Sequence, residues 1–299
     1  MYGVAKLQKI MSLLLFIKRQ LSVIWSDRLG RVGINILVFM IFLAVLAPVI
    51  APYDPQEICR HPDGSLKRME SPSLEHIFGT TIYGKDVLSQ TIWGTRTALK
   101  IGFFASVLAV LIGANIGLFS GYLGGMVDDV LMRITDIAYA LPFLPTCIVL
   151  VGILGTNQWI VIGVIGSLLW RTTARTVRSQ VLSLRSRPFV EAAKNAGASD
   201  LRIMYKEILP NILPLVFLFT AFSICWSIIA EVSLNFLGFG DPTQVSWGRI
   251  IYLAYAGQVM RIAWWWYVPP GMFITLFVAA CFYIGHAYEQ VANPRLQVY

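Results

Sequence analysis

Charged residues are scarce in this chain: of its 299 residues only 13% are Asp, Glu, Lys or Arg, whereas 57% are hydrophobic. A water-soluble domain usually carries charge on about a quarter of its residues. The mean hydropathy is +0.67, and a stretch as long as residues 101–121 contains no charged residue. The composition excludes an ordinary soluble domain and predicts a protein that spans a membrane.

Cysteine and histidine are rare as well, with four and three copies respectively. No two cysteines form a C-x-x-C pair, and the histidines do not cluster. The sequence therefore predicts neither a disulfide framework nor a zinc site, and we expect this chain to bind no metal or cofactor. The cysteines are Cys59, Cys147, Cys225 and Cys281.

Apolar runs that approach the roughly 20 residues needed by a membrane-spanning helix occur six times. They predict an all-α membrane protein in which residues 98–288 form a core of five spans, preceded by one further span. The fourth run is short, so Arg171 and Arg175 must reach toward the headgroups if the helix continues. The predicted spans are Ile34–Ile50, Ala98–Ser120, Val130–Leu154, Gln158–Thr176, Ile212–Phe236 and Tyr267–Tyr288.

Lys and Arg are concentrated in two segments. Residues 1–33 contain six of them and residues 171–210 contain eight, whereas residues 51–97 balance basic with acidic side chains. Because basic loops stay on the cytoplasmic side, we predict that residues 1–33 and the tail 289–299 are cytoplasmic and that 51–97 is an extracytoplasmic loop. The apolar patch in the first segment has no cleavage site after it, so we interpret the segment as amphipathic and lying on the membrane surface. The net charge of +8 then reflects topology, and no nucleic-acid partner is predicted.

The loop at about 177–211, between the fourth and fifth spans, is polar and helix-prone. Pro188 suits a first helical turn, and Gly197 is the residue expected where a short helix ends in a left-handed turn. The pattern predicts a helix of about two turns, which is marginal alone and needs a packing partner.

Three residues of this predicted helix could meet such a partner. Ala192 and Ala193 offer a small-residue face that another backbone can approach, and Glu191 near the helix start can accept hydrogen bonds from Arg or Lys. From the residues alone, a docking helix and a plain solvated connector fit equally well.

Few other polar residues suggest chemistry. The segment Gly79–Asp86 resembles a phosphate-binding loop until its last position, where Asp86 replaces the required Ser or Thr, so we expect no nucleotide site.

Glu231 and Asn235 lie inside the fifth span, where polar groups line a translocation path or join neighbouring helices. The position of Glu231 near the outer end of its span favours the structural role. Gly113 and Gly117 form a G-x-x-x-G pattern suited to close helix packing, within this chain or against a second one.

The 177–211 loop resembles the cytoplasmic loop by which permease subunits of ATP-binding-cassette importers grip their ATPase. Further segments, from about Asp27 to Leu296, are similar to the second-permease branch of the dipeptide/oligopeptide-type permeases. Thr81 and Lys85 depart from that family, which usually has Asp and Arg there, and Glu207 stands where the wider pattern is apolar. The loop residues that carry the likeness are Glu191, Ala192, Ala193, Gly197, Leu209 and Pro210. The further segments are residues 46–55, 76–89, 121–129, 234–240, 246–248 and 293–296.

The resemblance implies an inner-membrane heterodimer of this chain with a second, homologous permease, two cytoplasmic ATPases that carry ATP and Mg²⁺, and an extracytoplasmic solute-binding protein. In such an importer Glu191, Ala192, Ala193 and Gly197 would form the coupling helix, and this chain would supply half of the pore without being an enzyme. The resemblance implies a peptide as substrate, with an oligosaccharide or a nickel chelate as alternatives. A stand-alone channel or secondary transporter is the alternative of another class.

Overall fold

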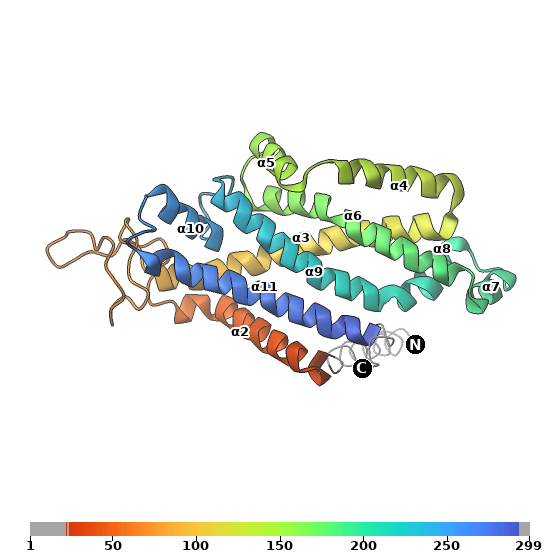
Figure 1. The fold of residues 1–299 in the computed structure, drawn as a ribbon, viewed down its shortest axis with the longest axis horizontal. Helices are drawn as coiled ribbons and strands as arrows, with labels where there is room; N and C mark the ends of the chain where they lie inside the picture. The colour runs from red at the N-terminus through yellow and green to blue at the C-terminus, as the bar shows by residue number, and fades with distance from the viewer. Residues whose placement is uncertain (1–21, 23, 293–299) are drawn as a thin grey trace, which may run out of the picture.

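The computed structural model describes residue 22 and residues 24–292, with side chains as far as Tyr288. Residues 24–292 contain helices and two isolated β-bridges but no strand, and Figure 1 shows the helices as an elongated bundle. The ends of the predicted N-terminal segment and tail, 1–21 and 293–299, lie outside the described residues. The helices are α2 (Arg28–Ile50), α3 (Val87–Leu123), α4 (Gly125–Ala140), α5 (Phe143–Leu154), α6 (Gln158–Arg185), α7 (Pro188–Asn195), α8 (Asp200–Arg202), the π-helix η1 (Ile203–Ile208), α9 (Leu209–Phe236), α10 (Trp247–Ala256) and α11 (Trp264–Ala292).

Five helical stretches in the described part are long and apolar enough to cross a membrane. They are α2, α3, α6, the continuous run from α8 through α9, and α11. The predicted span Val130–Leu154 is instead a pair of helices, α4 and α5, bent by 87°. If that pair is one broken span, the number of spans rises to six.

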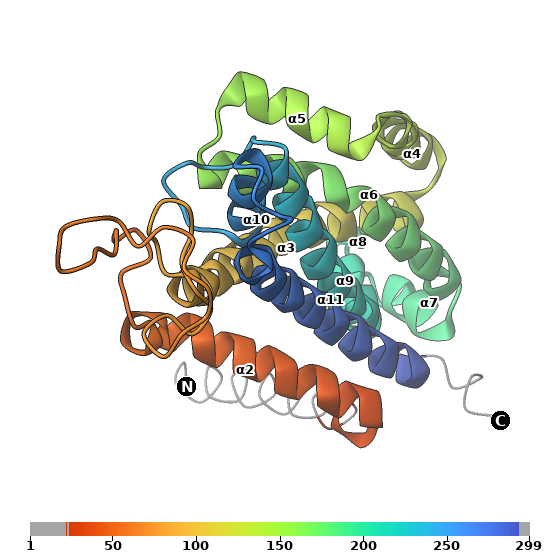
Figure 2. The same cartoon turned by 60° about the vertical axis from the view of Figure 1, so that its left-hand side comes forward.

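The bend between α4 and α5 has a local cause in the sequence. Leu141 and Pro142 both adopt extended backbone conformations, because a residue before proline is disfavoured in the α region and proline lacks an amide hydrogen for the helix. Figure 2 shows the result, with α4 seen nearly end-on while α5 lies across the view. The predicted span at Val130–Leu154 counts apolar residues across Pro142, so it does not indicate the break at this proline.

Two predicted boundaries also shift. α3 begins at Val87, not Ala98, because the Asp86 carboxylate accepts a hydrogen bond from the Ser89 amide at 2.7 Å and caps the helix. The extra turns carry polar residues that an apolar-run criterion rejects, yet they are buried by neighbouring segments. Likewise α2 begins at Arg28, not Ile34, with Asp27 as its cap.

α3 runs through the centre of the bundle and lies against α6 over much of its length (Figure 1). A Cβ atom added to Gly113 would lie 2.5 Å from the carbonyl oxygen of Trp170, and one added to Gly117 would lie 2.5 Å from that of Ala174. Both distances are too short for a real contact. The G-x-x-x-G pattern therefore serves a contact between helices of this chain.

α10 was not predicted. Ser246 caps it, and Trp247 in its first turn is fully buried, with Nε1 donating to the carbonyl oxygen of Thr91 at 2.9 Å. This short helix fixes the outer turns of α3 against the segment that follows α9.

Candidate functional site

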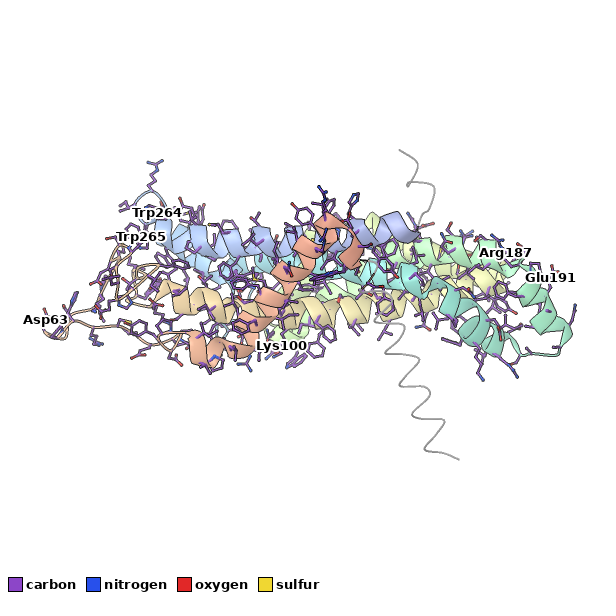
Figure 3. All side chains as sticks on the ribbon, turned by 90° about the horizontal axis from the view of Figure 1, so that it is seen from below. Asp63, Lys100, Arg187, Glu191, Trp264 and Trp265 are labelled. Atoms are coloured by element: carbon purple, nitrogen blue, oxygen red, sulfur yellow. The ribbon has the colours of Figure 1, made fainter. Side chains whose placement is uncertain are left out.

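The α7 loop, defined here as residues 186–208, contains the two-turn helix that the sequence predicts. α7 spans Pro188–Asn195, eight residues, with Pro188 in its first turn. Figure 3 shows Arg187 and Glu191 at one end of the molecule, far from Asp63 and Trp264 at the other. The loop therefore projects from one end of the bundle.

The end of α7 is a left-handed turn, as predicted. Gly197 has φ +75°, and a Cβ built on it would meet no atom within 4 Å, so the backbone conformation and not crowding requires glycine. The amide of Ala198 donates to the carbonyl oxygen of Ala193 at 3.0 Å, and the amide of Gly197 donates to that of Lys194 at 2.9 Å. These bonds satisfy carbonyl groups that the helix end leaves free.

One face of α7 is packed onto the bundle. Val190 is fully buried in an apolar cluster that includes Leu118 of α3 and Val177 of α6, and Ala193 lies against the same cluster. Burying a valine side chain contributes about 1.5 kcal/mol or more. Val190, which the sequence analysis did not single out, is the residue that holds the short helix in place.

The opposite face of α7 is exposed. Glu191 and Ala192 point away from the cluster, and no described residue forms a hydrogen bond or ion pair with the Glu191 carboxylate. Phe189, an apolar residue of the same helix, is also exposed, at 38%. The sequence analysis assigned both alanines to one docking face, whereas the structure turns Ala192 outward and Ala193 inward. The exposed face thus combines an unpaired acid, an aromatic ring and a small residue.

A polar cluster beneath α7 ties the loop to α3 and α6. The Tyr122 hydroxyl of α3 donates to Asp200 at 2.8 Å, and the Lys194 ammonium lies 5.3 Å from the centre of the Tyr122 ring. Arg185 at the end of α6 donates to the Tyr122 carbonyl oxygen at 3.3 Å. A displacement of α7 would therefore act directly on two spanning helices.

The second pair of candidate residues lies inside the chain. Glu231 and Asn235 are both buried, and the Asn235 amide donates to the Glu231 carboxylate at 2.7 Å. A Cβ added to Gly248 would lie 2.8 Å from the Asn235 Cβ, so the start of α10 is packed closely onto this pair. In this chain the pair joins α9 to α10.

Two arginines of α6 support the bend between α4 and α5. The Arg171 guanidinium donates to the carbonyl oxygen of Ala138 and, at 3.3 Å, to that of Leu141, where α4 ends. Arg175 pairs with Asp136 at 2.5 Å and lies over the Tyr139 ring. The sequence alone predicts that both side chains extend toward the lipid headgroups. Their spacing, one helical turn apart and beside a proline break, is the signal that could have indicated this role.

Comparison with known proteins identifies the family. A sequence model described as "binding-protein-dependent transport system inner membrane component" matches residues 113–298. The chain belongs to this family of importer permeases. A second model, described as the "N-terminal TM domain of oligopeptide transport permease C", matches residues 20–65. Family and apolar helices together make the chain a multi-pass protein of the inner membrane.

Several named proteins align with nearly the whole of this chain. A Brucella suis protein named as a peptide transport system permease protein is 36% identical over 90% of this chain and 88% of its own length. The oligopeptide transport system permease protein OppC of Haemophilus influenzae is 33% identical over 91% of this chain and 89% of its own. The dipeptide transport system permease protein DppC of Bacillus subtilis is 32% identical, over 91% and 83%.

The fold is also that of a solved importer. An inward-facing structure of the MetNI methionine ABC transporter superimposes with a TM-score of 0.54, covering 68% of this chain and 94% of the matched chain. At 17% sequence identity this likeness shows the fold alone. It confirms the expected all-helical permease fold.

Proposed function

We propose that this chain is one of two permease subunits of an ATP-driven, binding-protein-dependent importer of peptides, and that α7 docks on a cytoplasmic ATPase. The observation that carries the docking role is the division of α7 into two faces. Val190 fixes its inner face to the bundle, whereas Glu191 stays exposed without a partner among the described residues. A plain connector does not need a helix that is buried on one side and equipped with an unpaired acid on the other.

In this assembly the chain supplies half of the pore and no catalytic group, and the ATPases hold ATP and Mg²⁺. Closure of the ATPases on ATP would displace α7, and Tyr122 and Arg185 would pass that movement to α3 and α6. We assign Glu231 and Asn235 to the joint between α9 and α10 and not to the translocation path, because the bundle of this chain already encloses them.

The proposed topology has six spans with α4 and α5 as one broken span, and both termini on the cytoplasmic side with α7. In Figure 1, α2 begins and α11 ends toward the side from which α6 extends to α7. An even number of crossings gives this arrangement. The 51–86 segment then faces the solute-binding protein.

Peptides are the proposed substrate because relatives at 32–36% identity carry peptide, dipeptide or oligopeptide transport in their names. To test the assembly, the chain is tagged at its C-terminus and purified from native membranes. Recovery of a second permease with ATPases supports the importer. Recovery of the chain alone, even after crosslinking, would favour a stand-alone transporter, and an oligosaccharide or nickel chelate on a co-purified binding protein would replace the peptide.

The docking role is tested by Glu191→Lys. Because Glu191 is exposed and unpaired, the variant should insert and fold normally yet lose peptide uptake, since a lysine would repel the Arg or Lys expected on the ATPase. Asp129→Lys is the matched control, because Asp129 is another exposed acid that no described residue pairs with by hydrogen bond or ion pair, and it lies outside the α7 loop. Normal uptake by Glu191→Lys would contradict the docking role.

A further inference from the structure

A polar hollow of about 600 Å³ lies among the first turns of α3 and α6 and two loops at the same end of the bundle. We call it the α3–α6 hollow. Its volume falls within the range of about 300–1,000 Å³ that is usual for sites of small molecules. Its lining includes Asp54, Trp93, Arg96, Lys100 and Gln158.

The walls of the α3–α6 hollow are fixed by hydrogen bonds between distant segments. The Thr97 hydroxyl of α3 donates to the carbonyl oxygen of Val245 at 2.7 Å. The side-chain amide of Gln56 donates to the carbonyl oxygen of Thr243 at 3.1 Å. The backbone amide of Gln158, at the start of α6, donates to Asp241 at 3.1 Å. The hollow is therefore a built feature of the tertiary structure.

Two cationic side chains, Arg96 and Lys100, line this hollow. Arg96 forms no side-chain hydrogen bond or ion pair with a described residue and is held only by its position 5.6 Å from the Trp93 ring. The Lys100 ammonium lies 4.6 Å from the Trp159 ring and donates to the Gln158 side-chain oxygen at 2.9 Å. Lys100 forms no other hydrogen bond with a described residue, so the remaining N–H groups of its ammonium are available to a ligand.

The donors call for an anionic acceptor with two oxygens. A guanidinium group binds a carboxylate through two parallel hydrogen bonds, and an ammonium group adds a charged contact. Asp54 lines the same hollow. One of its carboxylate oxygens accepts a hydrogen bond from the backbone amide of Gln56 at 2.8 Å, and no described residue donates to the other oxygen. The hollow thus offers cations for a carboxylate and an anion for an ammonium group.

We propose that the α3–α6 hollow binds the two termini of an imported peptide, the carboxylate at Arg96 and Lys100 and the ammonium group at Asp54. This inference rests on the proposed function and names the part of the substrate that this chain recognises. A peptide released by a binding protein would meet a charge pattern complementary to its own ends before it moves on.

Binding of small probes to the full-length chain, purified with its partners in nanodiscs, tests this proposal. Dialanine should bind about tenfold more tightly than dialaninamide, which lacks the carboxylate, because a charge-assisted pair is lost. Arg96→Gln and Lys100→Gln should each abolish that preference. Arg68→Gln should leave it unchanged, because Arg68 is exposed and its side chain forms no hydrogen bond with a described residue.

A second arm probes the ammonium group. N-acetyl-dialanine should bind the wild-type chain more weakly than dialanine does. The two probes should bind the Asp54→Asn variant equally, and this variant keeps the oxygen that accepts the hydrogen bond from the Gln56 backbone amide. Equal binding of dialanine and dialaninamide to the wild type would overturn the proposal for the hollow while peptide uptake itself continued. Tighter binding of succinate than of dialanine would overturn the assignment to peptides, and absence of peptide uptake by the wild type would overturn the proposed function.

Discussion

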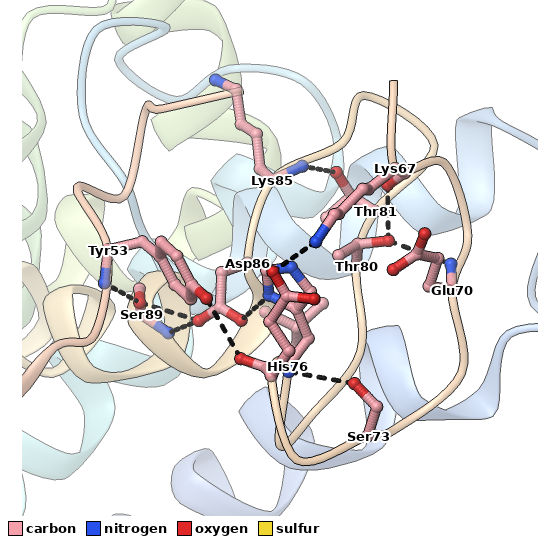
Figure 4. A network of polar contacts seen from close by, with 12 residues as sticks. Tyr53, Lys67, Glu70, Ser73, His76, Thr80, Thr81, Lys85, Asp86 and Ser89 are labelled. Carbon is pink, nitrogen blue, oxygen red and sulfur yellow. Dashed lines mark hydrogen bonds and ion pairs between the residues drawn. The ribbon is translucent and has the colours of Figure 1, made fainter. Parts of the chain in front are cut away.

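The 51–86 segment and the α7 loop both connect spanning helices, yet they are held in different ways. In the 51–86 segment the polar groups bind one another: His76 and Asp86 form a buried pair at 2.9 Å, and the Thr80 hydroxyl donates to the Lys67 carbonyl oxygen at 2.7 Å. Figure 4 shows this network, which continues through Ser89 into the first turn of α3. The hydrogen bonds of this network are made within the segment and with the start of α3, although His76 Nε2 has no partner among the described residues.

The α7 loop instead leaves polar groups unsatisfied on one side. Val190 anchors it, whereas Glu191 has no partner among the described residues. A network whose polar groups pair with one another holds its own segment together, whereas a helix with one buried and one unpaired face is suited to dock. We therefore expect substitutions in the His76–Asp86 network to affect stability and those on the outer face of α7 to affect only function.

The largest expected effect is that of Asp86→Ala. The substitution removes the cap of α3 and leaves the His76 ring without its partner, since the other ring nitrogen has none in the described residues. We expect a loss of about 3 kcal/mol in the free energy of unfolding, measured by thermal unfolding in detergent. Asp86→Asn, which keeps an acceptor for the cap, should lose less. An unchanged unfolding midpoint in Asp86→Ala would show that the network does not stabilise the segment.

A smaller, local effect is expected for Val190→Ala. Removing two methyl groups from a fully buried side chain should cost about 2 kcal/mol, confined to the α7 loop. Hydrogen exchange should then speed up for the amides of α7 but not for those of α3. The exposed neighbour Asn195 gives the control, since Asn195→Ala should leave exchange nearly unchanged. Equal protection in both variants would contradict the anchoring role of Val190.

The smallest effect concerns the ion pair between the buried Lys67 and the exposed Glu75. Its hydrogen bond to Lys67 holds the pKa of Glu75 below the ordinary value of 4.5. A lowered folded-state pKa gives a stabilisation that is present above the ordinary pKa and is lost as the pH falls through the folded-state value. Because the Glu75 carboxylate is exposed to solvent, the effect should be slight. Glu75→Gln should flatten the stability profile below pH 4.5, and an unchanged profile would show that the pair contributes nothing.

The α7 loop was predicted well because its signals are local. Pro188 and Gly197 restrict the backbone where they stand, so the helix bounds and the left-handed turn follow from the residues themselves. The inner and outer faces could not be assigned from the sequence in the same way. Ala192 and Ala193 are chemically identical, and only the position of α3 and α6 decides which one is buried.

The polar turns of α3 and the whole of α10 were missed for the opposite reason. The early turns of α3 are too polar for an apolar-run criterion, and they are helical because Asp86 caps them and Trp247 of α10 packs on them. The bend after α4 had a local signal in Pro142. The hydrogen bonds that Arg171 donates there join residues 33 and 30 positions apart in the sequence, so a local pattern does not reveal them.

The sequence by itself determined that the chain spans a membrane, roughly where its apolar helices lie and which family it resembles, because apolar run length, basic residues and backbone-restricting residues act locally. The tertiary structure decided which helix the glycines of α3 meet, which face of α7 remains free, and that Arg96 and Asp54 share one hollow. These features arise from contacts between residues far apart in the chain, and no local pattern specifies them.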